Sequence, residues 1–367
     1  MKKLLLYFAM LWLISACNNP EDARPVDVNP PTKGSYQNGV FIVNEGNFDW
    51  GVGTLSFLHD ATGNEAQQID NLIFKEANEF ELGNIFQSMK IIGGKGYLIL
   101  NNSEKIVIID PYTCKYLDQI DIPKGSPRYL EQVTDDKAYL TELYAGCFWV
   151  LDLKTNTVTK KVTTDGGWTE GIATIGNYAF ITKARTMYDS NQADQELLKI
   201  DKNTDEIVDR MPLPKGPKNV VVDKNAQLWV LCEGQIVGDS PQLVRIDPEQ
   251  MKITRQFSFD NLTATWPGHL RINREKNTLY YINGGVYQQP IDATTLNSQP
   301  FIPVAENQIY YGLDLDPAND DIYLSDAIDY LQKGLIFHYN HLGELISKFN
   351  ADVMPNQFVF WRPEEDK

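Results

Sequence analysis

The chain has 367 residues, of which 43% are hydrophobic and 11% aromatic, enough for the core of one large domain or two smaller ones. Its formal net charge is −16, and the sequence contains no run of Lys or Arg that could form a basic patch. Such a surface repels phosphate backbones and anionic bilayers, so we expect no nucleic acid as partner.

The first residues predict export and a lipid anchor. Lys2 and Lys3 precede an apolar stretch, residues 4–14, that is too short to span a bilayer but typical of a signal peptide. The following "LISAC" resembles a bacterial lipobox, in which Cys17 is lipidated, with palmitate among the acyl chains, after the signal peptide is removed. We therefore expect a signal peptide over residues 1–16 and a mature lipoprotein that begins at Cys17.

A tether follows the lipidated cysteine. Residues 17–34 are rich in Pro, Asn and acidic side chains, a composition that predicts an extended segment outside any core. The tether is expected to hold a globular body, residues 35–363, away from the membrane. The three cysteines of that body are an odd number, so no disulfide framework can include all of them, and Cys147 and Cys232 lie in apolar runs typical of buried thiols.

The globular body repeats one phrase, a hydrophobic residue followed by Asp, a turn and a new strand. In "IDPYTCKYL", "LDLKTNTVT", "IDKNTDEIV", "IDPEQMKIT" and "IDATTLNSQ" the aspartates are 42, 49, 46 and 45 residues apart, and Asp60 and Asn340 belong to degenerate copies. Such a period is typical of solenoids and propellers. We expect the aspartates to cap the turn between the third and fourth strands of each unit, a structural role and not a catalytic one.

The order of the strands predicts a closed ring. Each turn is preceded by a β-patterned segment such as "KGYLILNN", and before that by a short apolar segment such as "SMKIIGG". Six short segments occur in order, whereas the seventh, "NQFVFWR", follows the last complete unit. Pairing of this last strand with the first blade would remove the exposed sheet edges. The sequence thus predicts an all-β fold, a seven-bladed β-propeller with four antiparallel strands per blade, closed by the C-terminal strand joining the first blade.

One face of the propeller is the expected ligand site. The loops between blades and those between second and third strands carry aromatic and amide side chains, which suit a large, flat, partly apolar ligand with amide or hydroxyl groups. For each aromatic, packing between blades is the alternative, and the long polar loop over 183–196 is either a flap over the ligand or a variable insertion. The candidate ligand-binding residues are Trp50, Gln87, Asn102, Arg128, Tyr144, Trp168, Glu170, Tyr188, Asn219, Trp266, His269, Tyr287, Tyr311, Tyr330 and Gln357.

The signatures of common enzyme classes do not occur. The sequence contains no G-x-S-x-G, H-E-x-x-H, Walker or dinucleotide-binding motif and no Cys/His cluster with zinc spacing. His59, His338 and His341 are expected to be structural, and His269 to lie near the channel mouth without a catalytic role. The acidic run over 314–329 keeps calcium binding as an alternative, although EF-hand spacing is missing. We expect no cofactor and no enzyme; a lyase would use Glu170, Glu233, His269 and Asp326.

The repeat unit lacks the Trp-Asp dipeptide of WD40 proteins and resembles the YncE-like, or YVTN-type, bacterial propellers. Over nearly its full length the chain resembles surface lipoproteins of Bacteroidetes built on that propeller, and among them the BtuG-type cobalamin-binding proteins. The resemblance implies a corrinoid (cobalamin) held on one propeller face and a TonB-dependent outer-membrane barrel as partner. It also implies a place on the cell surface, attached to the outer membrane through the lipid alone. The alternatives are a glycan or siderophore as ligand, a metal-dependent lyase or lactonase, and a scaffold that binds another protein.

Overall fold

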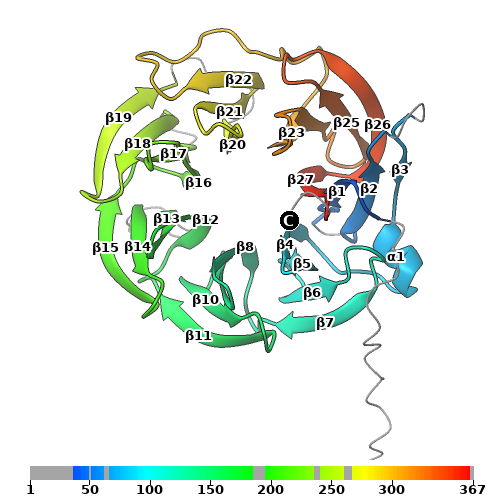
Figure 1. Cartoon of the computed structure of the whole chain (residues 1–367), viewed down its shortest axis with the longest axis horizontal. Coiled ribbons are helices and arrows are strands. Elements are labelled where there is room, and N and C mark those ends of the chain that lie inside the picture. The colour runs from blue at the N-terminus through cyan, green and yellow to red at the C-terminus, as the bar shows by residue number, and fades with distance from the viewer. Residues whose placement is uncertain are drawn as a thin grey trace, which may run out of the picture. The chain divides into compact units, whose positions relative to one another are not determined.

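The computed structural model describes residues 36–48, 51–61, 66–184, 195–234, 240–259 and 267–363. In these residues the chain forms seven antiparallel sheets, which are the blades of a ring around a central channel (Figure 1). The predicted seven-bladed β-propeller is therefore confirmed. The predicted signal peptide, Cys17 and the tether lie outside the described residues.

The first four blades follow the predicted strand pattern, and each is described from the channel outward. Blade 1 contains β27 (Pro355–Trp361), β1 (Gly39–Asn44), β2 (Thr54–His59) and β3 (Ile69–Asp70). Blade 2 contains β4 (Phe86–Ile92), β5 (Lys95–Leu100), β6 (Lys105–Ile109) and β7 (Tyr116–Asp121). Blade 3 contains β8 (Pro127–Thr134), β9 (Lys137–Glu142), β10 (Cys147–Asp152) and β11 (Thr157–Thr163). Blade 4 contains β12 (Trp168–Ile175), β13 (Tyr178–Ala184), β14 (Glu196–Asp201) and β15 (Glu206–Pro212).

The other three blades complete the ring. Blade 5 contains β16 (Pro217–Val222), β17 (Leu228–Cys232), β18 (Gln242–Asp247) and β19 (Lys252–Ser258). Blade 6 contains β20 (Gly268–Ile272), β21 (Thr278–Asn283) and β22 (Gly285–Pro290), and a single bridge from Ile302 to Val286 occupies the place of a fourth strand. Blade 7 contains β23 (Tyr310–Leu315), β24 (Ile322–Asp326), β25 (Lys333–Tyr339) and β26 (Leu345–Val353).

Burial explains why the second strand of each blade is so apolar. All six residues of β1 are buried because neighbouring blades cover both faces of this strand. The outermost strand β7, in contrast, exposes five of its six residues. The sequence therefore reads as a continuous apolar run near the channel and as a polar segment at the rim.

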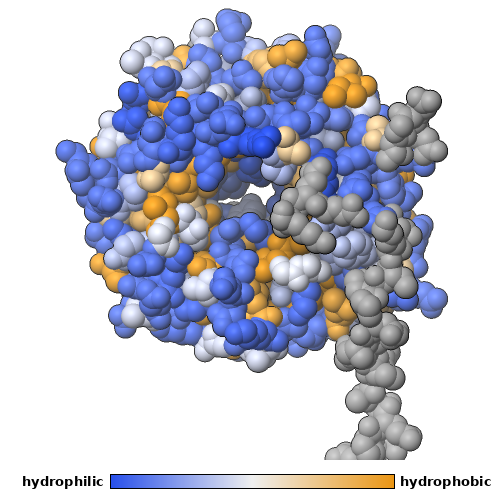
Figure 2. Space-filling view, in the orientation of Figure 1, coloured by the Kyte–Doolittle hydropathy of each residue, from blue (hydrophilic) through white to orange (hydrophobic). Residues whose placement is uncertain are grey.

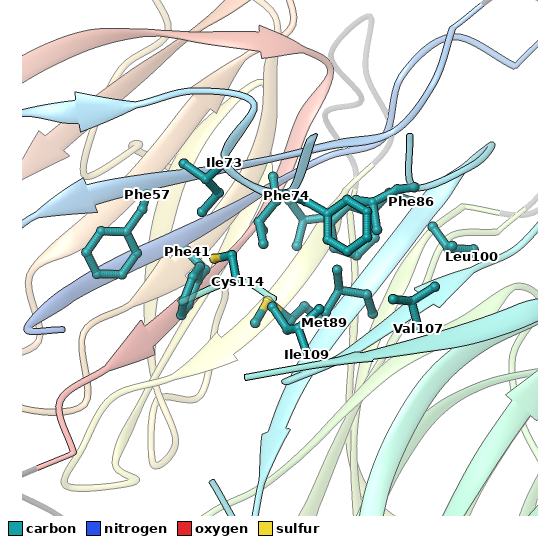
Figure 3. Packing of buried hydrophobic residues seen from close by; sticks show 14 of the residues in the cluster. Phe41, Phe57, Ile73, Phe74, Phe86, Met89, Leu100, Val107, Ile109 and Cys114 are labelled. Carbon is teal, nitrogen blue, oxygen red and sulfur yellow. The ribbon is translucent and has the colours of Figure 1, made fainter. Parts of the chain in front are cut away.

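The core lies between adjacent blades. Between blades 1 and 2, Phe41 and Phe57 of one sheet face Met89, Leu100 and Ile109 of the other (Figure 3). The helix α1 (Ile73–Asn78), which the sequence did not predict, adds two buried apolar side chains to this cluster. No helix among the described residues is long and apolar enough to cross a membrane.

The C-terminal strand closes the ring, as predicted. β27 pairs with β1 along its whole length, so strands from the two ends of the chain share blade 1. After it, Arg362 forms ion pairs with Asp60 of blade 1, at 2.8 Å, and with Asp316 of blade 7, at 2.7 Å. Contacts from one blade to the next thus continue across the junction of the two chain ends.

Five of the seven repeat positions cap their turns as predicted, whereas the carboxylate of Asp60 pairs with Arg362 and Asp292 forms no such cap with the described residues. The Oδ1 atom of Asp152 accepts hydrogen bonds from the backbone N–H groups of Lys154, at 2.8 Å, and Thr155, at 2.9 Å. Asp110, Asp201, Asp247 and Asn340 accept equivalent bonds in their own blades. These side chains fix the turn from the third to the fourth strand.

Candidate functional site

A β-bulge interrupts the inner strand of every blade near its start. The pairing between each inner strand and its neighbour shifts register there, so the inner strand carries one extra residue. Bulges of this kind commonly redirect side chains next to functional sites. The residues at the seven shifts, which we call the bulge ring, are Gln87, Arg128, Glu170, Lys218, His269, Tyr311 and Asn356.

The bulge ring surrounds a cavity of about 880 Å³, lined by inner-strand residues of all seven blades. Six bulge-ring side chains line it. Glu170 does not, but it accepts a hydrogen bond from Arg128, which does. Loops after the second strands also contribute, including Phe48 and Tyr144, so both predicted loop sets meet at one cavity. Figure 2 shows the ring open at its centre, with hydrophilic and hydrophobic residues mixed around the opening.

Arg128 links three blades along the cavity wall. Its guanidinium donates to the carboxylate of Glu170 in blade 4, at 3.2 Å and 3.3 Å, and to the side-chain oxygen of Gln87 in blade 2. Burial lowers the pKa of Arg128, but the charges of Glu170 and Glu45 raise it by more, so the group stays protonated. The charge of Arg128 is therefore already compensated within the protein.

A second polar cluster centres on Glu45, which follows β1. Its carboxylate accepts hydrogen bonds from the Tyr311 hydroxyl, at 2.6 Å, and the Asn356 amide, at 2.7 Å. Only 8% of Glu45 is exposed, and this burial raises its pKa although the bond from Tyr311 acts in the opposite direction. Gly312 allows the inner strands to approach here, because a Cβ at that position would lie 2.4 Å from the Asn356 carbonyl oxygen.

The remaining bulge positions belong to blades 5 and 6. Lys218 pairs with Glu233 at 2.9 Å, and the charge of that carboxylate raises the pKa of the lysine against the effect of burial. His269 has a positive φ of 54°, and its ring centroid lies 6.3 Å from that of Tyr311. Burial lowers the pKa of His269 well below its usual value, and the charges of Arg271 and Lys218 add to this effect, so the imidazole is neutral.

The structure brings most of the predicted site residues to the cavity. Its lining includes Gln87, Arg128, Tyr144, Asn219, His269, Tyr311, Tyr330 and Gln357. Glu170 lies directly behind Arg128, and Trp168 lies behind Tyr144, with ring centroids 6.2 Å apart. Trp50, Tyr188 and Trp266 lie outside the described residues, as does most of the long loop over 183–196.

Two predicted residues lie elsewhere. Asn102 is exposed and does not line the cavity, whereas its neighbour Asn101 does. Tyr287 stacks on Tyr281 with centroids 5.6 Å apart, in the core between blades 5 and 6. Its aromatic ring therefore packs between blades, which was the alternative expected for any one aromatic.

Several lining residues were not predicted as ligand contacts. They include Glu45, Tyr129, Lys218, Glu233 and Asn356. Lys218 and Asn356 each stand one residue before a predicted one, because the bulge shifts the register at the start of the strand. The spacing of the repeat located these strands but not the bulges, because the alternation of apolar and polar residues along a strand does not reveal an extra residue.

The acidic run over 314–329 is spread over separate contacts. Asp314 pairs with Arg271, Asp321 lies 3.0 Å from a ring nitrogen of His338, and Asp326 accepts two backbone N–H bonds. Among the described residues, no three His, Cys, Asp or Glu side chains form a group that could hold a metal ion. Cys114, Cys147 and Cys232 are buried free thiols, as expected for the two in apolar runs.

The raised pKa of Glu45 predicts a pH-dependent effect of Glu45→Gln. In the variant the glutamine oxygen can accept from the Asn356 amide and the glutamine NH2 can donate to the Tyr311 hydroxyl, so both contacts are kept while the cost of burying a charge is removed. With a folded-state pKa above 4.5, wild type loses stability as pH rises through that value. The variant should therefore have the higher melting temperature at pH 7 to 8, and the difference should vanish at pH 4. A variant that melts lower than wild type at pH 8 would contradict this prediction.

The comparisons with solved structures agree on the fold. A quinoprotein alcohol dehydrogenase-like protein of Bacteroides thetaiotaomicron is 14% identical, with a TM-score of 0.62 over 88% of this chain and 91% of the other. A candidate 6-phosphogluconolactonase of Bacteroides fragilis is 13% identical, with a TM-score of 0.63 over 90% and 99%. Dihydro-heme d1 dehydrogenase NirN in complex with DHE is 10% identical, with a TM-score of 0.56 over 90% and 77%.

These structures differ in their described activities, so the likeness shows the fold alone. No curated protein matches the sequence. A family model does match, over residues 38–361, which is nearly the whole propeller. The chain therefore belongs to the family DUF5074, a domain of unknown function.

Proposed function

We propose that this protein is an outer-membrane lipoprotein that captures a corrinoid in its central cavity and delivers it to a TonB-dependent transporter. The observation that carries the binding role is the bulge ring, one residue from each blade and each of a different type, around about 880 Å³. A volume near the upper end of the usual range for ligand pockets suits a large ligand. The variety of side chains suits recognition better than one repeated chemistry.

The charge pattern of the cavity favours a ligand without strong net charge. Each cation of the wall already has a carboxylate partner, and the pairs Arg128–Glu170 and Arg271–Asp314 are largely buried. A ligand with charged groups at its edge would have to break such a pair and leave one member buried without compensation. A ligand whose edge carries neutral amides avoids this cost, even where its centre holds the charge of a metal.

Free amide groups and aromatic rings complete the match. Gln357 and Asn219 each accept one hydrogen bond through the side-chain oxygen, and neither amide nitrogen has a partner among the described residues. Tyr144 and Tyr330 line the cavity with 47% and 37% of their surface exposed. Rings and amides of this kind can cover a flat macrocycle whose edge carries amides, which describes a corrinoid.

The position of the acids gives less support to a lyase. Glu170 is held by Arg128, and Asp326 accepts hydrogen bonds from the backbone N–H groups of Ile309, at 3.0 Å, and Ile328, at 2.8 Å. Asp326 does not line the cavity, so the four candidate groups do not converge on one point. The lipid anchor at Cys17 and the transporter rest on the lipobox and on the family resemblance.

Titration of the purified full-length protein with cyanocobalamin tests the proposal. We expect saturable one-to-one binding by calorimetry, with quenching of tryptophan fluorescence. Tyr311→Ala should weaken binding at least tenfold, because the ring lies between the cavity and the buried Glu45. Tyr178→Ala, at the start of β13 and outside the cavity lining, is the matched control and should bind as wild type.

The absence of both heat and quenching at high micromolar cyanocobalamin, and equally with diaquocobinamide, a corrinoid without the nucleotide base, would overturn the corrinoid proposal. Glycans and siderophores would then be titrated in the same way. Lactonase and lyase activities would be assayed with and without added divalent cations.

A further inference from the structure

His269 is the exception in the bulge ring. The other six side chains each form a hydrogen bond or ion pair with another side chain, in the groups Gln87–Arg128–Glu170, Lys218–Glu233 and Tyr311–Glu45–Asn356. The ring nitrogens of His269 have no hydrogen-bond partner among the described residues. His269 is half-buried and lines the cavity, so its ring nitrogens are accessible to a ligand bound there.

The backbone aims this imidazole at the cavity. His269 lies at the register shift of β20, with a left-handed φ of 54°, and it lines the cavity between blades 5 and 7. Its ring plane makes an angle of 58° with that of Tyr311. A neutral imidazole in this position offers a lone pair for coordination and an N–H for donation.

If His269 is the single protein ligand to a metal, only certain kinds of metal-containing ligand can bind there. A bare metal ion in a protein usually takes three or four ligands from the chain, and the described residues contain no such group. One imidazole is sufficient for a metal that a macrocycle already holds in its plane, because only an axial position is then left for the protein.

We propose that His269 is an axial ligand to the cobalt of the captured corrinoid. This inference rests on the proposed function and names the contact through which the metal is recognised. On binding, a ring nitrogen of His269 forms a bond to Co(III) and one coordinated water leaves, with no change of oxidation state. Corrinoids with an exchangeable axial ligand would bind more tightly than those with both axial positions blocked.

The test uses diaquocobinamide, in which water occupies both axial positions and no nucleotide base competes. Wild-type full-length protein is expected to bind it and to shift its visible absorption bands, as free imidazole does at high concentration. His269→Gly and His269→Asn both tolerate a positive φ, so they keep the backbone while removing the imidazole. Both should abolish the shift and weaken binding at least tenfold. Imidazole added at a concentration too low to change the bands of the free corrinoid should restore the shift in the glycine variant.

His341→Ala, in the exposed turn after β25, is the matched control and should shift the bands as wild type does. Binding that calorimetry detects with unchanged bands, or a shift that persists in both His269 variants, would overturn axial ligation and leave corrinoid capture standing. Failure of both diaquocobinamide and cyanocobalamin to bind wild type would overturn the proposed function and this inference together.

Discussion

A chain that ends at Met354, and so lacks β27, should fail to fold into a stable ring. The strand pairs with β1 along its length and buries Phe358 and Trp361 between blades. Its loss would expose an edge of the most buried strand of blade 1 and remove Asn356 from the cavity. We expect loss of the cooperative thermal transition in circular dichroism and association into soluble aggregates.

A peptide of residues 355–363 provides the control. Added in trans, it should occupy the open edge by strand addition and restore part of the thermal transition, whereas a scrambled peptide of the same composition should not. A truncated chain that melts as sharply as wild type without the peptide would show that closure by β27 is dispensable.

Arg128→Ala should be the most destabilising single substitution in the cavity wall. Arg128 is 15% exposed and its partner Glu170 only 4%, so the alanine variant leaves a carboxylate buried without a counter-charge. Removal of one member of such a pair costs about 3–5 kcal/mol. Urea denaturation at pH 7 should show a loss of this size in the free energy of unfolding, together with weaker ligand binding.

The double variant Arg128→Met with Glu170→Leu separates the two causes. Because no charge is then left buried, most of the lost stability should return, while ligand binding stays weak. Lys154→Ala, which removes a pair with Asp136 at the exposed rim, should leave stability unchanged. A mild effect of Arg128→Ala, equal to that of Lys154→Ala, would mean that water reaches Glu170 freely.

The sequence was enough to predict the architecture because its signals are local and repeated. The turn caps at Asp110, Asp152 and Asp201 bind backbone groups two or three residues away, so each unit carries its own marker. The seventh inner-strand segment, Asn356–Arg362, follows the last complete unit along the chain. Its position in the sequence therefore already indicated that the ring closes by pairing the last strand with the first blade. The sequence did not predict α1, which has no side-chain cap at its start and is only six residues long.

The candidate site was predictable in part, for a related reason. The repeat gives the start of each inner strand, so Gln87, Arg128, His269 and Tyr311 could be placed near the cavity. In blade 5 the sequence predicted Asn219, whereas the residue at the register shift is its neighbour Lys218. The prediction missed by one position because a bulge adds one residue to the inner strand without changing its composition.

The sequence by itself determined the number of blades, the closure by the last strand and the face on which polar and aromatic loops gather. All three follow from short-range patterns that recur along the chain. Only the tertiary structure decided which charged and polar side chains meet. Arg128 pairs with Glu170, 42 residues away in the sequence, and Tyr311 bonds to Glu45, 266 residues away. It also decided that His269 stays unpaired among the described residues, because pairing depends on distances between blades that no local pattern encodes.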